Sequence, residues 1–194
     1  MAFVTFIIPT IGRDTLKRAI DSLKAQIVND WKAIVIADEL MAEPGYLMDE
    51  RIDFIPFFEK LGEYGKDKRS RSGLVRNKGL ELVTSEWVAF LDDDDVVRAD
   101  YVKFLMMYSE EFIPIVVFRA HFPNGDILPP ISNRLDLGMV GISFAVRMNL
   151  INTYKIRFNN SGCEDWQFLN LCKARGKYVV SPYITYDVRP KVDS

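Results

Sequence analysis

Short apolar runs alternate with segments of helical periodicity along the first half of the chain. Continuous apolar runs predict buried strands at residues 3–8, 33–37, 52–58 and 87–91. Apolar residues at helical spacing predict helices at 14–27, 73–84 and 99–111, the first of them capped by Asp14. A strand, a helix and a strand in succession form a βαβ unit, whose strands are parallel. Residues 1–110 are therefore expected to form an α/β half of the nucleotide-binding type with a mostly parallel sheet.

The second half of the chain has a different pattern. We expect strands at 115–119, 139–147 and 178–180, a hairpin turn at Asn124-Gly125, a helix at 164–175 and a polar tail. Gly176 follows the predicted helix directly, at the C′ position that glycine favours because it adopts a left-handed backbone freely. No repeat or linker divides the sequence. We therefore expect one domain over residues 1–194, a central sheet flanked by helices, with a smaller mixed half over 111–194.

Composition and charge exclude several classes of protein. The chain has 194 residues, and its 25 lysines and arginines against 27 aspartates and glutamates argue against a nucleic-acid-binding protein. One histidine excludes zinc sites built on several histidines, and two cysteines form no disulfide framework. The beginning has no signal-peptide features, and no apolar run reaches the roughly 20 residues of a membrane span. A cytoplasmic location is the expectation, either for a compact enzyme or for a catalytic domain of a longer protein.

Four adjacent aspartates, Asp92 to Asp95, are the sharpest chemical feature of the sequence. They follow the apolar run at 87–91 directly, so they lie at the carboxyl end of a strand, where open α/β sheets bind ligands. Carboxylate oxygens on a short loop suit Mg²⁺ or Mn²⁺, usually together with substrate phosphates. The alternative is a solvated acidic turn in which Asp95 caps the following helix.

A basic segment leads into the predicted helix at 73–84. Six cations stand against one acid between residues 66 and 78, and glycines in the segment allow the backbone to approach a ligand closely. Such a segment suits a phosphate group, above all beside an acidic metal loop, but on its own it is equally consistent with a solvated loop. The six cations are Lys66, Lys68, Arg69, Arg71, Arg76 and Lys78.

Two further acids occupy positions that suit chemistry. Asp165 shares a face of its predicted helix with Phe168 and Leu169, so it can point into a cleft and act as a base. Alternatively, Asp165 is a first-turn acid that the helix dipole favours. Asp38 ends the second predicted strand, where a carboxylate can accept hydrogen bonds from a nucleoside; its alternative is a plain loop acid.

Taken in chain order, these motifs resemble a family 2 glycosyltransferase with the GT-A fold. The strand that ends in Pro9-Thr10, with the helix after it, resembles the family's opening, and Asp38 stands at the acid that reads uracil. The family usually continues that second motif with Gly-Ser, where this chain has Glu39-Leu40. Three later stretches are similar to the family's Ala-Arg-Asn-x-Gly-Leu, DxD and Glu-Asp motifs: Arg76-Asn77-Lys78-Gly79-Leu80, Asp92-Asp93-Asp94 and Glu164-Asp165.

The resemblance implies inverting transfer of a sugar from a UDP-sugar to an acceptor hydroxyl, such as one on a glycan. It implies Asp165 as the catalytic base, and Asp94 with Asp92 as ligands of Mn²⁺ or Mg²⁺. Trp166 is equally consistent with a place in the core. The implied nucleotide-sugar-binding residues are Pro9, Thr10, Asp38, Arg71, Arg76, Asp92 and Asp93, and the implied acceptor or sugar contacts are Glu164 and Trp166.

Two alternatives remain open from the sequence. Asp92-x-Asp94 after an apolar strand also resembles the loop of haloacid dehalogenase-like phosphatases, with Asp92 as nucleophile and Asp94 as acid and base. Against this reading, the motif lies late in the chain and no Gly-Asp-x-x-x-Asp motif follows it. The other alternative is a nucleotide-sugar-binding module without turnover, which substitution of Asp165 distinguishes from an enzyme.

Overall fold

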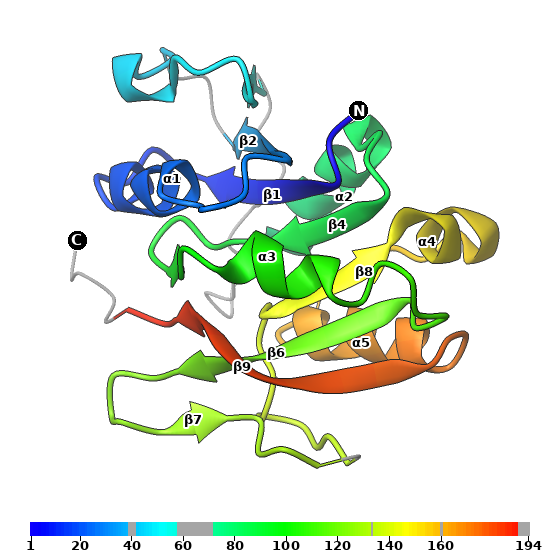
Figure 1. Ribbon diagram of the computed structural model, residues 1–194. Helices are drawn as coiled ribbons and strands as arrows, with labels where there is room; N and C mark the ends of the chain where they lie inside the picture. The colour runs from blue at the N-terminus through cyan, green and yellow to red at the C-terminus, as the bar shows by residue number, and fades with distance from the viewer. Residues whose placement is uncertain (39–41, 58–71, 133, 160, 190–194) are drawn as a thin grey trace.

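One nine-stranded sheet runs through the described part of the chain (Figure 1). The computed structural model describes residues 1–38, 42–57, 72–132, 134–159 and 161–189. The strand order is β3-β2-β1-β4-β8-β6-β9-β5, with β7 paired to β6. The strands are β1 Val4–Thr10, β2 Trp31–Ala37, β3 Ile52–Pro56, β4 Trp87–Phe90, β5 Val96–Val97, β6 Ile115–His121, β7 Ile127–Leu128, β8 Phe144–Arg147 and β9 Tyr178–Asp187. The helices are α1 Leu16–Lys24, η1 Gly45–Leu47, α2 Ser72–Leu82, α3 Tyr101–Met106, α4 Met148–Tyr154 and α5 Glu164–Lys173.

The first half of the sheet is parallel, as the apolar runs predict. β1 pairs in parallel with both β2 and β4, and β2 pairs in parallel with β3. All seven residues of β1 are buried, which explains its continuous apolar run and its place inside the sheet. Because the carboxyl ends of parallel strands meet at one edge, Thr10, Asp38 and Asp92 come together there.

Alternating side chains on β1 attach helices to both faces of the sheet. Phe6 packs edge-on against Tyr101 of α3, with ring centroids 5.1 Å apart. The next residue, Ile7, points to the opposite face, where it meets α2. A Cβ at Gly79 would lie 2.6 Å from Ile7 Cγ2, so only glycine lets α2 pack this closely on β1. Figure 1 shows α3 in front of the sheet, with α2 and α5 behind it.

The second half of the sheet is mixed, in agreement with the expected fold class. β8 pairs antiparallel with β4 and with β6, whereas β9 pairs parallel with β6 and antiparallel with β5. Behind this half, α5 inserts Phe168 into an aromatic cluster. Its ring stacks on Phe158 at 3.9 Å and meets Phe90 edge-on at 5.7 Å. This cluster fixes α5, and with it residues 164 and 165, against the end of β4.

The prediction for the end of the chain is wrong. Only strand pieces at 178–180 and a polar tail are expected, but β9 continues to Asp187. Ser181 and Pro182 interrupt the apolar run, and the structure accommodates them in an irregularity where the register with β6 shifts, between the pairs Val117–Val180 and Arg119–Ile184. The strand then resumes and reaches the acidic residues that follow β4.

Several predicted ends also differ from the structure. The first helix begins at Leu16 after Thr15, so Asp14 is not its N-cap. The predicted helix at 99–111 ends at Met106, and only the last part of the predicted strand at 139–147 forms β8. The short elements β5, η1 and α4 were not predicted, because each is too short to set up a periodic pattern.

Gly176 has a different purpose from the predicted left-handed cap. Its φ is not positive; the positive-φ glycines among the described residues are Gly12, Gly125 and Gly138. A Cβ at Gly176 would lie 2.6 Å from Pro114 Cγ, so the glycine permits close approach of the chain to Pro114. Gly125 does have a positive φ of 90° and forms the predicted hairpin between β6 and β7.

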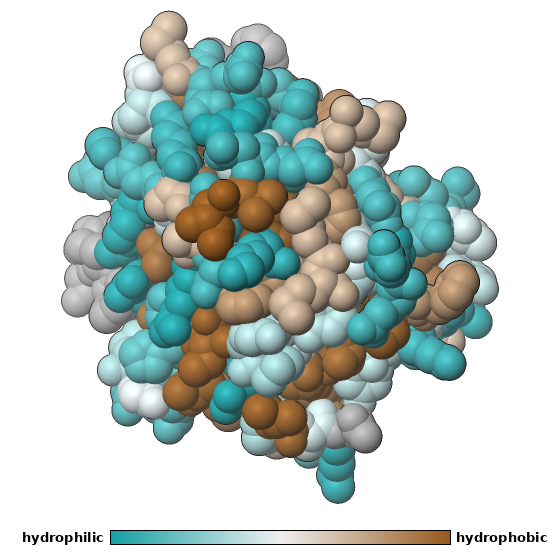
Figure 2. Space-filling view, viewed as in Figure 1, coloured by the Kyte–Doolittle hydropathy of each residue, from teal (hydrophilic) through white to brown (hydrophobic). Residues whose placement is uncertain are grey.

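The surface is mostly hydrophilic on the face drawn in Figure 2, with separate hydrophobic areas near its centre and towards the bottom. Within the described residues, we find no helix with both the length and the apolar character that crossing a bilayer requires.

Candidate active site

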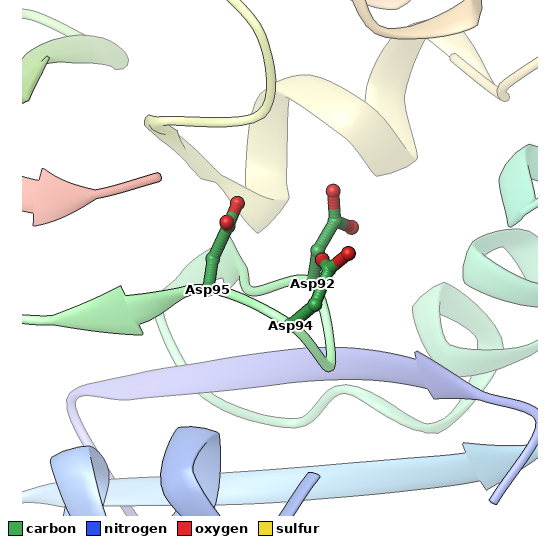
Figure 3. A group of neighbouring side chains, drawn as sticks. All are labelled: Asp92, Asp94 and Asp95. Carbon is green, nitrogen blue, oxygen red and sulfur yellow. The ribbon is translucent and has the colours of Figure 1, made fainter. Parts of the chain in front are cut away.

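An acidic turn follows β4 at the carboxyl edge of the parallel strands. Asp92, Asp94 and Asp95 each offer a carboxylate oxygen, and these atoms lie within 4.8 Å of one another (Figure 3). The turn is closed by the Asp95 N–H, which donates to the Asp92 carbonyl oxygen at 3.1 Å. Arg18 of α1 donates to the Asp94 carbonyl oxygen at 2.6 Å and ties the turn to the first helix. The predicted pair Asp92 and Asp94 is therefore joined by a third acid.

Asp95 is held by the end of β9 and by the residues just after it, the part of the chain that was expected to be a polar tail. The Arg189 N–H donates to Asp95 Oδ1 at 3.0 Å, and the Tyr186 hydroxyl also hydrogen-bonds the carboxylate. The same hydroxyl accepts the Asp92 N–H at 3.2 Å. Burial, together with the neighbouring Asp92, raises the pKa of Asp95 to about 7. Helix α3 begins at Tyr101, so Asp95 does not cap it.

These three acids fit a divalent cation. They supply oxygen ligands only, which is the donor set of Mg²⁺ and Mn²⁺. Burial and then the charge of Asp92 raise the pKa of Asp95, and a bound divalent cation would compensate both effects by favouring the ionised carboxylate. Asp92, Asp94 and Asp95 would hold the ion.

Asp93 points away from this cluster. It is 3% exposed and accepts hydrogen bonds from the Thr10 hydroxyl at 2.7 Å and from Arg13 Nη1 at 2.8 Å. Burial raises the pKa of Asp93, although Thr10 and Arg13 oppose the shift. Arg13 Nη1 also lies 3.9 Å from Asp94 Oδ2. This arginine, whose guanidinium lies beside the acidic turn, was not singled out from the sequence. The predicted contact of Thr10 and Asp93 with nucleotide or sugar stays a prediction.

Arg76 of α2 joins the acidic turn to the predicted base. Its side chain is 2% exposed; Nη2 lies 2.5 Å from Asp92 Oδ1, and Nη1 lies 2.9 Å from Glu164 Oε1 and 3.1 Å from Asp165 Oδ1. Ser72, one turn earlier on α2, donates to Glu164 at 2.6 Å and accepts from Arg76 at 3.1 Å. Burial lowers the pKa of Arg76, but the three carboxylates outweigh it and hold the pKa above its ordinary value.

The predicted base lies beside the acidic turn, as its place in the sequence motif implies. Asp165 occupies the first turn of α5, and its side chain is 29% exposed. Burial raises its pKa to about 6; Arg76 opposes this shift, and Asp92 and Glu164 add to it. A carboxylate with a pKa near neutrality is well matched to taking a proton. Its neighbour Glu164 is buried and accepts a hydrogen bond from Ser72 of α2. The predicted contact of Glu164 with an acceptor stays a prediction.

The remaining predicted residues lie near the same edge or outside the described residues. Pro9 is a buried residue of β1, and Asp38, also buried, donates its N–H to the Thr10 carbonyl oxygen at 2.8 Å. Trp166 is half-buried, with Lys173 Nζ 4.9 Å from its ring centroid. Arg71 and Glu39, and most of the basic segment, lie outside the described residues.

A parallel first half, a mixed second half and an acidic turn between them match the GT-A type fold. The chain belongs to glycosyl transferase family 2: the family model described as "Glycosyl transferase family 2" matches residues 5–164.

Known relatives are consistent with this family. EpsH of Bacillus subtilis (strain 168) is 29% identical over 109 residues, which are 55% of this chain and 28% of EpsH. The succinoglycan biosynthesis protein ExoW of Rhizobium meliloti (strain 1021) is 33% identical over 106 residues, 53% of this chain and 32% of ExoW. The crystal structure of S. aureus TarS 1–349 has a TM-score of 0.79 at 17% identity, covering 97% of this chain and 60% of that one. The chain thus spans about a third or less of these curated relatives.

Proposed function

We propose that this protein transfers a sugar from a UDP-sugar to an acceptor hydroxyl, with inversion at the anomeric carbon. The observation that carries the proposal is the shared guanidinium of Arg76, which brings Asp165 next to the acidic turn at Asp92. A base and a cation-binding turn side by side are what such a transfer needs: one accepts the acceptor's proton, and the other faces the departing diphosphate.

The roles divide between the two halves of the chain. Asp38, with Pro9 and Thr10 at the same edge of the sheet, is proposed to hold the nucleoside, and Arg71 is proposed to act with them. A divalent cation on the acidic turn would supply charge stabilisation for the leaving diphosphate. Asp165 takes the proton of the acceptor hydroxyl, while the acceptor oxygen bonds to the anomeric carbon and the bond from that carbon to the diphosphate breaks on the opposite face.

The choice of donor and acceptor rests on the relatives. TarS has been solved in complex with UDP and with UDP-GlcNAc, and this chain matches the latter structure with a TM-score of 0.77 over its whole length. ExoW is described as a protein of succinoglycan biosynthesis, which supports a glycan acceptor. We therefore propose UDP-GlcNAc as the first donor to test and a growing glycan as the acceptor class, with Trp166 offering an aromatic face to a sugar ring.

A thermal-shift panel of nucleotide sugars, with and without Mn²⁺, tests the proposal. Ligand binding to the folded state raises the melting temperature, so UDP and UDP-GlcNAc should raise it more with Mn²⁺ than without. Release of UDP from UDP-GlcNAc, followed by a coupled assay, then reports turnover. If neither UDP nor any UDP-sugar shifts the melting temperature, the proposed function is wrong.

The two alternatives from the sequence are separable. Family membership speaks against the phosphatase, and Asp92 is ion-paired at 2.5 Å with Arg76, which makes it a poor nucleophile. A non-catalytic binding module remains distinguishable by Asp165→Asn. An enzyme retains UDP binding in this variant and loses UDP release, whereas a binding module shows no UDP release in either form.

A further inference from the structure

We propose that Arg76 is a positioning residue for the base Asp165 and the ligand Asp92, and that it does not contact the nucleotide. This inference rests on the proposed function above and replaces the nucleotide-binding role that the sequence motif implies for Arg76. The motif places an arginine at the site but says nothing of which way its guanidinium faces.

The contacts of the guanidinium leave little of it for a ligand. Nη2 is paired with Asp92, and Nη1 is shared by Ser72, Glu164 and Asp165 at 2.9 to 3.1 Å. The side chain is 2% exposed, and its Nε is buried without a hydrogen-bond partner among the described residues. A nucleotide could reach this cation only by displacing carboxylates that already neutralise it.

The surroundings of Arg76 are built to hold it still. Its guanidinium carbon lies 5.5 Å from the ring centroid of Phe158, and that ring stacks on Phe168 of α5. The next residue of α2, Asn77, ties the helix to the same segment: its amide donates to the Phe158 carbonyl oxygen and accepts the Phe158 N–H, both at 2.9 Å. A Cβ at Gly73 would lie 2.9 Å from the Asn159 carbonyl oxygen, so α2 and the chain leading to α5 are in direct backbone contact.

The consequence for the reaction is geometric. One oxygen of Asp92 and one of Asp165 are ion-paired with the same rigid, planar guanidinium of Arg76. The distance between the acidic turn and the proposed base is therefore fixed before a UDP-sugar binds. Loss of this link should leave donor binding in place and misplace the base. A misplacement of about 1 Å costs on the order of 100-fold in rate.

Kinetics and binding of Arg76→Gln and Arg76→Lys test the assignment. Binding of UDP with Mn²⁺ is measured by calorimetry, and kcat and KM are measured for UDP release from UDP-GlcNAc. We expect kcat of Arg76→Gln to fall about 100-fold while the Kd of UDP changes less than about threefold. Arg76→Lys should recover part of kcat, because an ammonium keeps one of the ion pairs. A Kd raised tenfold or more with a smaller loss of kcat would show a nucleotide contact and overturn the assignment.

A control arginine separates positioning from general destabilisation. Arg147 lies on β8, its side chain is 16% exposed, it pairs with Glu86, and it donates to the Tyr108, Ser109 and Glu111 carbonyl oxygens. Arg147→Gln should lower the melting temperature without a comparable loss of kcat. An equal loss of kcat in both glutamine variants would assign the effect of Arg76 to stability alone.

Two further variants keep the inference testable if Arg76→Gln does not fold. Glu164→Gln retains Arg76 but removes one of the carboxylates that hold its guanidinium in place, so kcat should fall while the Kd of UDP stays the same. An unchanged kcat would count against a positioning role for Arg76. Arg76→Lys combined with Asp165→Asn should be no slower than Asp165→Asn alone, because positioning has no effect once the base is gone. Additive losses would overturn the inference. Absence of UDP binding in the unmodified protein would instead overturn the proposed function.

Discussion

Asp165→Asn should raise the free energy of unfolding at neutral pH in the absence of a divalent metal ion, and it should abolish the proposed sugar transfer. The Asp165 side chain is partly buried, so its negative charge is poorly solvated. Its pKa is raised from 3.8 to about 6, so the folded chain holds this proton more tightly than the unfolded chain does. Between these two pKa values the folded state binds more protons, and the free energy of unfolding therefore decreases as the pH rises.

The magnitude follows from the size of the shift. Roughly two pKa units at 1.36 kcal/mol each set an upper limit of about 3 kcal/mol for the stability lost above pH 7. Because the side chain is 29% exposed and solvent screens part of its charge, we expect a gain of about 1–2 kcal/mol for the asparagine variant at pH 7.5. At pH 4 the aspartate is itself protonated in the folded state, and the difference should largely vanish.

Urea denaturation in the presence of EDTA, at pH 4 and at pH 7.5, measures both values. Asp21→Asn serves as the control, since Asp21 forms an exposed ion pair with Lys17 on α1 and its removal should change stability by less than about 0.5 kcal/mol at either pH. A variant that is less stable than the original protein at pH 7.5, or a gain that is the same at both pH values, would refute the reasoning.

Three smaller predictions concern the cation site and the packing beneath it. Since the pKa of Asp95 is about 7, Mn²⁺ affinity measured by calorimetry should fall up to about tenfold per pH unit below that value, and a flat profile from pH 5 to 7 would contradict this. Tyr186→Phe removes a hydrogen bond that favours ionised Asp95, so it should weaken Mn²⁺ binding at pH 7; unchanged affinity would count against it. Gly79→Ala should cost about 1–3 kcal/mol in urea denaturation, because its Cβ would meet Ile7, whereas Gly45→Ala has nothing within 4 Å and should have little effect; equal losses would contradict the packing argument.

The inner strands of the parallel half, β1, β2 and β4, were predictable because nearly all of their residues are buried. A strand that is buried on both faces has an unbroken apolar sequence, and the observed bounds of these strands are close to the predicted ones. The edge of the sheet was predictable for the same reason: Asp38 and Asp92 follow two of these runs directly. The strands of the mixed half were harder to predict from the sequence, because β5 has only two residues and β9 is irregular around Pro182.

The candidate site divides in the same way. Asp92, Asp94 and Asp165 could be proposed from local motifs, since each belongs to a short recognisable stretch. The contacts of Tyr186 and Arg13 with this site could not, because they depend on pairings between segments more than 75 residues apart: 94 for Tyr186 with Asp92 and 80 for Arg13 with Asp93. Asp95 belongs to the acidic run in the sequence, but only the structure shows that its carboxylate lies with those of Asp92 and Asp94 and does not cap α3.

The long return of β9 also sets an order of events during synthesis. Its terminal contacts, from Tyr186 to Asp92 and from Arg189 to Asp95, each span 94 residues. A nascent chain that has left the ribosome only as far as α5 already contains the four aspartates, but it lacks the Tyr186 hydroxyl and the Arg189 N–H that contact Asp92 and Asp95. Closing contacts of this length is slow relative to local helix formation. The acidic turn therefore matures last, and an incomplete chain would carry a cluster of mutually repelling carboxylates without the strand that organises them.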